Sequence, residues 1–143
     1  MLFMVGIEPP ASELEAYGII VPVFSSLGYG CFSAADTRPE ILYQAKAAIL
    51  AMAEEVINDG HLLSSLNEGY VDHQAANPDF KEWLALEVPV EALKGKQKRV
   101  NVTLSEPLLA RVDAYVACHN ECKDRSDFLA KAADNLMQST QNV

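Results

Sequence analysis

Residues 99–104 read Arg-Val-Asn-Val-Thr-Leu, and apolar side chains alternate with polar ones along this stretch. A period of two is the pattern of a β-strand that buries one face and exposes the other. The apolar face would carry two valines and a leucine. The polar face would carry Arg99, Asn101 and Thr103. The stretch therefore predicts a half-buried strand, and the fold of the C-terminal third depends on what this strand pairs with.

Two amphipathic helices are predicted after the strand. Ser105 can cap the first helix, and Pro107 is tolerated in its first turn. Apolar residues at helical spacing between 108 and 116 line one face of that helix. Ser126 is a candidate cap for the second helix, whose apolar face spans 128–137. The C-terminal third is therefore predicted to be strand, helix, helix.

A module of about 45 residues with a single strand cannot satisfy the strand's edges or bury its apolar faces alone. Pairing the strand with its copy in a second chain solves both problems. The predicted product is a homodimer with a two-stranded antiparallel ribbon over four helices. The sequence leaves open whether two such dimers join into a tetramer.

This arrangement resembles the ribbon-helix-helix repressors over roughly residues 97–138. The resembling strings are KRVNVTLSEPLLARVDAYV at 98–116 and DRSDFLAKAADNL at 124–136. The resemblance implies that the ribbon enters the major groove of operator DNA, which a two-stranded ribbon fits. Arg99, Asn101 and Thr103 would then read bases, since arginine pairs with guanine and asparagine with adenine.

Four further residues are candidates for contacts to the DNA backbone. They are Lys96, Lys98, Ser126 and Asp127. The lysines supply positive charge beside the ribbon, and the start of the second helix can direct its N–H groups at a phosphate. The alternative is that the polar face of the ribbon is only the solvent-exposed face of a dimerisation element.

The first two thirds of the chain predict an α+β domain, a small sheet with one packed helix. Apolar, β-branched runs predict strands at 2–7, 17–23 and 31–34, and 83–90 returns to alternation as a fourth strand. Thr37 and Glu40 have the spacing of a capping box before a helix that ends near 58–60. The flexible basic stretch 94–98 is the predicted linker between domains at 1–93 and 99–143.

Charge is divided unevenly between the two predicted domains. Residues 1–95 hold four basic and fourteen acidic side chains, a net charge of −10, whereas residues 96–143 hold seven and six, a net charge of +1. An acidic N-terminal part suits a basic protein partner and repels nucleic acid. A merely well-solvated surface is the alternative explanation.

The stretch from Tyr17 to Gly60 carries a more specific pattern. An aromatic-Gly strand start (17–18), Pro22, a Gly-Cys-Phe-Ser step (30–33) and Asp-Thr (36–37) precede an alanine-rich helix. This pattern resembles the N-terminal domain of the HicB antitoxins, a reduced RNase H-like fold without nuclease function. One difference is that the loop after Pro22 is longer and lacks an acidic residue of the family's short turn.

The HicB resemblance implies a function and a partner. The chain would be an antitoxin that masks a small basic HicA toxin, an mRNA-cleaving RNase, and represses its own operon. Acidic side chains near sheet edges or turns are the candidates for toxin binding: Glu8, Glu13, Glu15, Asp36 and Glu40. The alternatives are a stand-alone regulator with a ligand-sensing N-terminal domain and a degenerate RNase H-like enzyme.

Other chemistry has little support in the sequence. Metal-dependent nucleases need converging carboxylates, and the predicted strands carry no Asp or Glu in their interiors. Cys118 and Cys122 have the spacing of a reduced helical pair rather than a zinc set. We therefore expect no catalytic residue, metal or cofactor. Without a signal-peptide or membrane-span pattern, and with three cysteines, a cytoplasmic protein is expected.

Overall fold

The computed structural model of the chain describes residues 1–141 and divides into two compact units, Met1–Gln97 and Lys98–Val143. Residues 142–143, which end the predicted second domain, lie outside the described part. Each unit is considered by itself.

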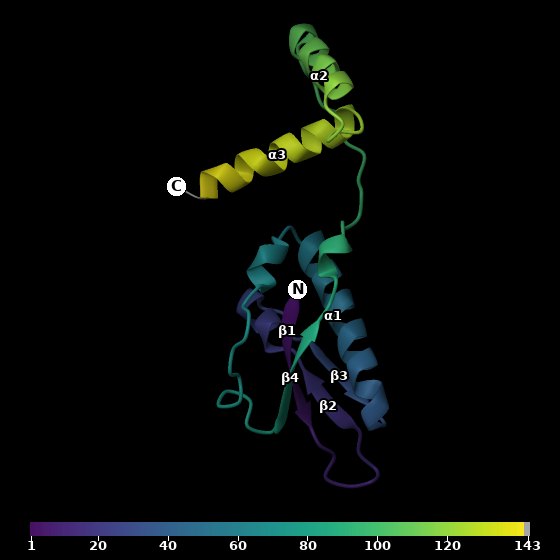
Figure 1. Ribbon diagram of the computed structural model, residues 1–143, viewed down its shortest axis with the longest axis vertical. Coiled ribbons are helices and arrows are strands. Elements are labelled where there is room, and N and C mark those ends of the chain that lie inside the picture. The colour runs from purple at the N-terminus through teal and green to yellow at the C-terminus, as the bar shows by residue number, and fades with distance from the viewer. Residues whose placement is uncertain (142–143) are drawn as a thin grey trace. The chain divides into compact units, whose positions relative to one another are not determined.

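The N-terminal unit is built on a four-stranded sheet (Figure 1). Its strands are β1 (Leu2–Glu8), β2 (Tyr17–Ile20), β3 (Phe32–Ala35) and β4 (Glu82–Glu87). The order across the sheet is β3-β2-β1-β4, and every neighbouring pair is antiparallel. The first three strands form an antiparallel meander. The fourth adds beside β1, so the predicted four-stranded sheet is confirmed.

One face of the sheet is covered by helix α1 (Ile41–Asn58), which runs along the sheet on the side of β3 (Figure 1). The helix buries one stripe at helical spacing: Ile41, Ala45, Ile49, Ala53 and Val56. Alternate residues of β1, Phe3, Val5 and Ile7, belong to the same core. This α+β arrangement follows from the two periods read in the sequence.

The other face of β1 depends on a glycine. Gly6 lies opposite Trp83 on β4 and opposite Ile20 on β2. A Cβ atom at Gly6 would lie 2.7 Å from Cη2 of Trp83, so the indole occupies the space that a side chain would fill. The indole N–H donates to Gln74 Oε1 and to the Phe80 carbonyl, both at 2.9 Å. These bonds attach the long 61–81 connection to the sheet.

Several boundaries differ from the sequence predictions. The second strand ends at Ile20 rather than at residue 23, because Pro22–Leu27 forms a 3₁₀ helix that ends at Gly28 with a φ of 85°. Proline cannot donate to a sheet ladder, which explains the early end. The third strand is shifted by one residue, and the fourth ends at Glu87 rather than at residue 90.

The predicted capping box before α1 is wrong. The Thr37 side chain accepts no capping hydrogen bond; instead, the Glu40 N–H donates to the Thr37 carbonyl at 3.2 Å. The chain enters α1 through a 3₁₀ turn, Arg38–Glu40. Pro39 favours such a turn because its φ is already fixed near helical values.

The C-terminal unit contains two helices, α2 (Glu106–Cys118) and α3 (Arg125–Gln141). The predicted cap of α2 is confirmed, because Ser105 Oγ accepts from the Leu108 N–H at 3.3 Å. The predicted cap of α3 is wrong: α3 begins one residue before Ser126, and the Asp124 carboxylate accepts from the Asp127 N–H at 2.8 Å. Aspartate and serine are both good N-caps, and Asp124 holds the position here.

Residues 99–104 are neither helix nor strand in the described chain. They are exposed, apart from the half-buried Leu104. A β-strand needs a ladder partner beside it, and the predicted partner of this stretch is a second chain. The ribbon therefore stays a prediction.

Candidate functional site

The C-terminal unit leaves most of its apolar side chains uncovered. Among its described residues, only Val112 and Cys122 are buried hydrophobics. Val100 is 69% exposed, Val102 is 63% exposed and Leu136 is 70% exposed. Isolated apolar side chains on a surface are ordinary, but a unit with almost no core of its own needs another surface to cover it.

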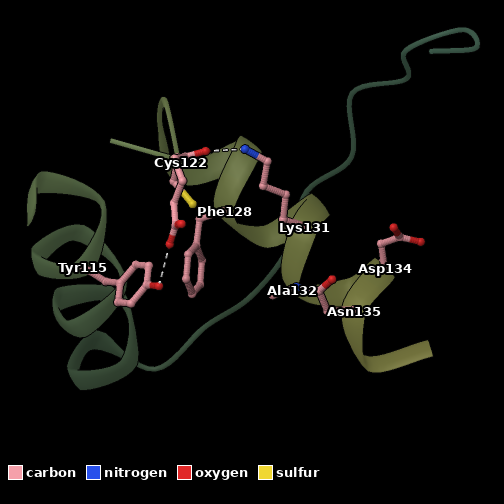
Figure 2. Close-up of a pocket in the computed structure, with 8 residues that line it drawn as sticks. Tyr115, Cys122, Phe128, Lys131, Ala132, Asp134 and Asn135 are labelled. Atoms are coloured by element: carbon pink, nitrogen blue, oxygen red, sulfur yellow. Dashed lines mark hydrogen bonds between the residues drawn. The ribbon is translucent and has the colours of Figure 1, made fainter. Parts of the chain in front are cut away.

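Two contacts join α2 to α3. Asp113 accepts hydrogen bonds from Nε and Nη2 of Arg125 at 3.1 and 2.9 Å. The Arg125 guanidinium holds the pKa of Asp113 below its usual value. Figure 2 shows Tyr115 and Phe128 facing each other, with ring centroids 5.2 Å apart. The loop between the helices is tied down by Lys131, whose ammonium donates to the Glu121 carbonyl. The helix pair is thus ordered although it is poorly buried.

The structure brings the 99–104 stretch to the start of α3. An open hollow beside the stretch is lined by Val100, Val102, Thr103, Leu104, Leu109, Arg125, Ser126 and Leu129. Thr103, a candidate base reader, and Ser126, a candidate phosphate contact, therefore border the same hollow. Arg99 and Asn101 are exposed and do not line it.

The remaining candidates for contacts to the DNA backbone differ in their surroundings. Lys96 and Lys98 are both exposed, and the backbone N–H of Lys96 donates to Asn58 Oδ1 at 2.9 Å. Asp127 is engaged within its own unit. Its carboxylate accepts from the Lys123 N–H at 3.0 Å and from Lys131 Nζ at 2.9 Å, and these two bonds lower its pKa.

The backbone N–H of Asp127 donates to the carboxylate of Asp124. The start of α3 therefore carries two carboxylates that already hold backbone N–H groups. A phosphate at this end of α3 would have to approach the side of Ser126.

The five candidate toxin-binding acids gather at one end of the N-terminal unit. β1 and β3 are both antiparallel to β2, so they run in the same direction and their C-terminal ends lie at the same end of the sheet. Glu8 ends β1, Glu13 and Glu15 lie in the following loop, and Asp36 and Glu40 follow β3. All five are exposed. The sequence could name these residues, but only the strand directions place them together.

An ion pair lies at the same end of the sheet. Arg38 donates to both carboxylate oxygens of Glu82, at 3.2 and 2.6 Å. The guanidinium lies 5.6 Å from the centre of the Tyr17 ring and lowers the pKa of Glu82. Because Arg38 and Glu82 neutralise each other, the acidic side chains around them determine the local charge.

The described residues also bear on metal binding and on cysteine reactivity. Within residues 1–141, no three His, Cys, Asp or Glu side chains come together in a way that could hold a metal ion. Burial raises the pKa of the Cys31 thiol to about 11, which keeps it protonated near neutral pH. No described helix is both long enough and apolar enough to cross a membrane.

Comparison with known proteins identifies the family. A family model described as the HicB-like antitoxin of bacterial toxin–antitoxin systems matches residues 3–133. The chain belongs to the HicB-like antitoxin family. An uncharacterised 14.9 kDa protein from the rep-hol intergenic region of Haemophilus phage HP1 is 36% identical over 112 residues, which cover 77% of this chain and 83% of that protein.

Two solved HicB structures resemble the chain along most of its length. The Burkholderia pseudomallei antitoxin HicB is 27% identical, covers 93% of this chain and 96% of its own, and has a TM-score of 0.47. The antitoxin HicB3 is 26% identical, with coverages of 93% and 95% and the same TM-score.

Two features of this HicB-like chain escape sequence reasoning. The Asp124 cap was missed because Ser126, two positions later, has an equal preference for the cap position. The exposed Phe32 at the edge of the sheet was hidden because the 31–34 run looks like any short strand. Only the strand order shows that β3 is an edge. The Gly-Cys-Phe step was the available signal for Phe32.

Proposed function

We propose that this chain is the antitoxin of a toxin–antitoxin pair, with one task for each unit. The N-terminal unit binds and masks a small basic HicA-like toxin. The C-terminal unit dimerises through residues 99–104 and represses the chain's own operon. Membership of the HicB-like antitoxin family supports the first task, and the uncovered apolar face of the C-terminal unit carries the second.

The exposed apolar side chains of the C-terminal unit favour dimerisation. Val100 and Val102 expose most of their surface in a single chain. Burying such a side chain fully is worth about 1.5–3 kcal/mol, and a two-fold ribbon buries each of them twice. Pairing also satisfies the N–H and C=O groups of the stretch, which have no ladder among the described residues.

The polar side chains of the same stretch then acquire a function. If the valines face the partner chain, Arg99, Asn101 and Thr103 emerge on the opposite side from both chains. Six side chains on one ribbon match the width and chemistry of the major groove. The weak net charge of the C-terminal part, +1, favours cooperative binding of two dimers on a longer operator over tight binding by one.

Masking of the toxin follows from charge. A basic RNA-binding surface is neutralised by an acidic one, which also speeds association. The acids at the end of the sheet and the net charge of −10 over residues 1–95 supply the complement.

The two tasks can be separated by a double substitution, Arg99→Ala with Asn101→Ala. The loss of two base contacts worth about 1–3 kcal/mol each in every chain is expected to abolish specific binding to the DNA upstream of the chain's own gene. Neutralisation of the toxin encoded beside it should be unchanged. Gel-shift titration measures the first property, and survival on toxin co-expression measures the second.

The matched control replaces Arg111 and Asn120, the same residue types elsewhere in the C-terminal unit, with alanine. This control should retain specific binding. Normal operator affinity in the Arg99/Asn101 variant would overturn the assignment of the ribbon. Loss of toxin neutralisation in a folded Arg99/Asn101 variant would show that the two tasks do not belong to separate units. Failure of a folded fragment of residues 1–92 to neutralise the toxin would favour a stand-alone regulator.

A further inference from the structure

Strand β3 leaves hydrogen-bonding groups open at the edge of the sheet. The Val21 N–H donates to the Cys31 carbonyl at 3.0 Å, and the register continues from that pair along β2 and β3. In an antiparallel pair, every second pair of residues exchanges hydrogen bonds, and the pairs between them point their backbone groups outward. The N–H and C=O groups of Phe32 and Ala34 therefore point away from β2, and both residues are exposed.

This edge lacks the features that keep sheet edges from pairing. Natural edges carry charged residues or prolines. The opposite edge follows that rule, since β4 begins with Glu82 and ends with Glu87. β3 reads Phe-Ser-Ala-Ala and has neither. In the described chain, the sheet is thus protected on one side and open on the other.

An apolar groove accompanies the open edge. Phe32 is 66% exposed, and its ring lies over Gly30, where a Cβ atom would come within 2.9 Å of Phe32 Cε2. The groove between this strand and the neighbouring helix is lined by Cys31, Phe32, Ala48, Ala51, Met52 and Glu55. Phe32 pairs with Ile20, so its ring lies on the sheet face that carries Ile20 and Trp83, whereas the small alanines of α1 leave room beside Cys31 on the opposite face. An added strand would therefore meet Phe32 on one face and this groove on the other.

The acidic side chains near the β3 edge favour a basic binding partner. Glu55 lines the groove, and Asp36 follows directly after β3. A second copy of this unit would bring the same excess of acidic residues against these carboxylates and would be repelled. A basic segment would be attracted. An extended segment would satisfy the open backbone groups by adding a strand, as many peptide-binding sheets do.

We propose that the β3 edge and its groove bind an extended, basic segment of the toxin as a fifth strand, with an apolar side chain of that segment packed on Phe32. This inference rests on the proposed function and specifies where the partner docks. The acids beyond the end of β3 then lie beside the added strand, where they contact the rest of the basic partner.

The test measures the affinity of the full chain for the small basic protein encoded beside it, by calorimetric titration. Phe32→Ala removes the aromatic anchor and should weaken binding about 30-fold, as expected for a hot-spot residue. Ala34→Pro removes an outward N–H that β2 does not use and should weaken binding at least 10-fold. Glu55→Lys should weaken binding and make it less dependent on salt.

Each variant has a matched control or a check of its fold. Tyr70→Ala removes an aromatic side chain that is 81% exposed and lies outside the groove, and Glu54→Lys makes the same charge change on the neighbouring residue of α1. Both controls should bind within about threefold of the wild type. Circular dichroism confirms that Ala34→Pro is folded, and Phe32→Ala tests the same edge without altering the backbone.

The outcomes separate this inference from the function on which it rests. Failure of the wild type to bind the basic protein would overturn both. Tight binding by the wild type together with normal binding by Phe32→Ala and Ala34→Pro would overturn the docking site alone. A change in the oligomeric mass of Ala34→Pro would show that a second copy of the chain occupies the edge, which also overturns the proposal.

Discussion

Asp113 and Arg125 join the two helices of the C-terminal unit through a pair of hydrogen bonds on an exposed surface. The guanidinium favours the ionised form of Asp113, so the pKa of this carboxyl is lower in the folded chain than in the unfolded one. A carboxyl of this kind contributes stability above its ordinary pKa, and that contribution is lost as the pH falls through its folded pKa.

Asp113→Asn should therefore destabilise the chain slightly at pH 7. The difference from the wild type should shrink as the pH is lowered below 3.8, the ordinary value for aspartate, and vanish once Asp113 is protonated in the folded state. Urea unfolding followed by circular dichroism at several pH values measures this. Asp134→Asn is the matched control, since Asp134 accepts a hydrogen bond from Gln138 on its own helix. A difference that stays constant as the pH falls below 3.8 would contradict the assignment.

Single residues also mark where sequence reasoning stops. Ser105 was predicted as a cap because nothing nearby competes with it. Asp124 and Ser126 are two good caps only two positions apart, and the choice between them depends on tertiary contacts. Lys131 holds the carboxylate of Asp127 and the carbonyl of Glu121, which fixes the loop before α3. A one-dimensional pattern does not contain these contacts.

At the scale of elements, helix α1 forms the core of the N-terminal unit with the sheet. Ile49 is fully buried on the face of α1 that covers the sheet. Ile49→Ala should lower the free energy of unfolding by about 2–5 kcal/mol, because it removes buried methyl groups and leaves a cavity. The single tryptophan, Trp83, lies in this unit, and its fluorescence during urea unfolding measures the effect.

Leu42→Ala is the control for this prediction. Leu42 is on the same helix but is 51% exposed, so its replacement should cost less than about 1 kcal/mol. Equal costs for the two substitutions would mean that α1 does not bury the predicted stripe.

The elements that were predicted well are those with a strong period. α1 repeats apolar residues at helical spacing over five turns, and β1 is an apolar run stopped by prolines. The second strand was predicted too long because the run after Ile20 is still apolar and β-branched. The proline within that run ends the ladder and starts a 3₁₀ turn. Its apolar residues are buried all the same, with Phe24 stacked on Phe3 at 5.9 Å.

At the scale of the whole molecule, the two units differ in net charge and in the extent of their buried cores. The acidic N-terminal unit has a complete core and an open sheet edge. The C-terminal unit has almost no core and an uncovered apolar face. The proposed function would use both features, the first as a surface for a protein partner and the second as a surface for a second copy of the chain.

A single chain cannot display what the alternation at 99–104 predicts. The period of two indicates a strand, whereas the ladder that would define the strand requires a second chain. The candidate base readers are exposed, and their role stays a prediction because it depends on the same pairing. The sequence was sufficient for the two helices because each has an apolar stripe at helical spacing, although the predicted cap of α3 was wrong.

The most direct test of the account is the oligomeric mass of the full chain in solution, measured by light scattering for the wild type, Val102→Asp and Thr103→Asp. One chain weighs 15.6 kDa. The wild type should have at least twice that mass. Val102→Asp should be monomeric, because it places two unpaired carboxylates in the ribbon core. Thr103→Asp should keep the wild-type mass and lose operator binding. A monomeric wild type, or a Val102→Asp variant that still assembles, would contradict the account.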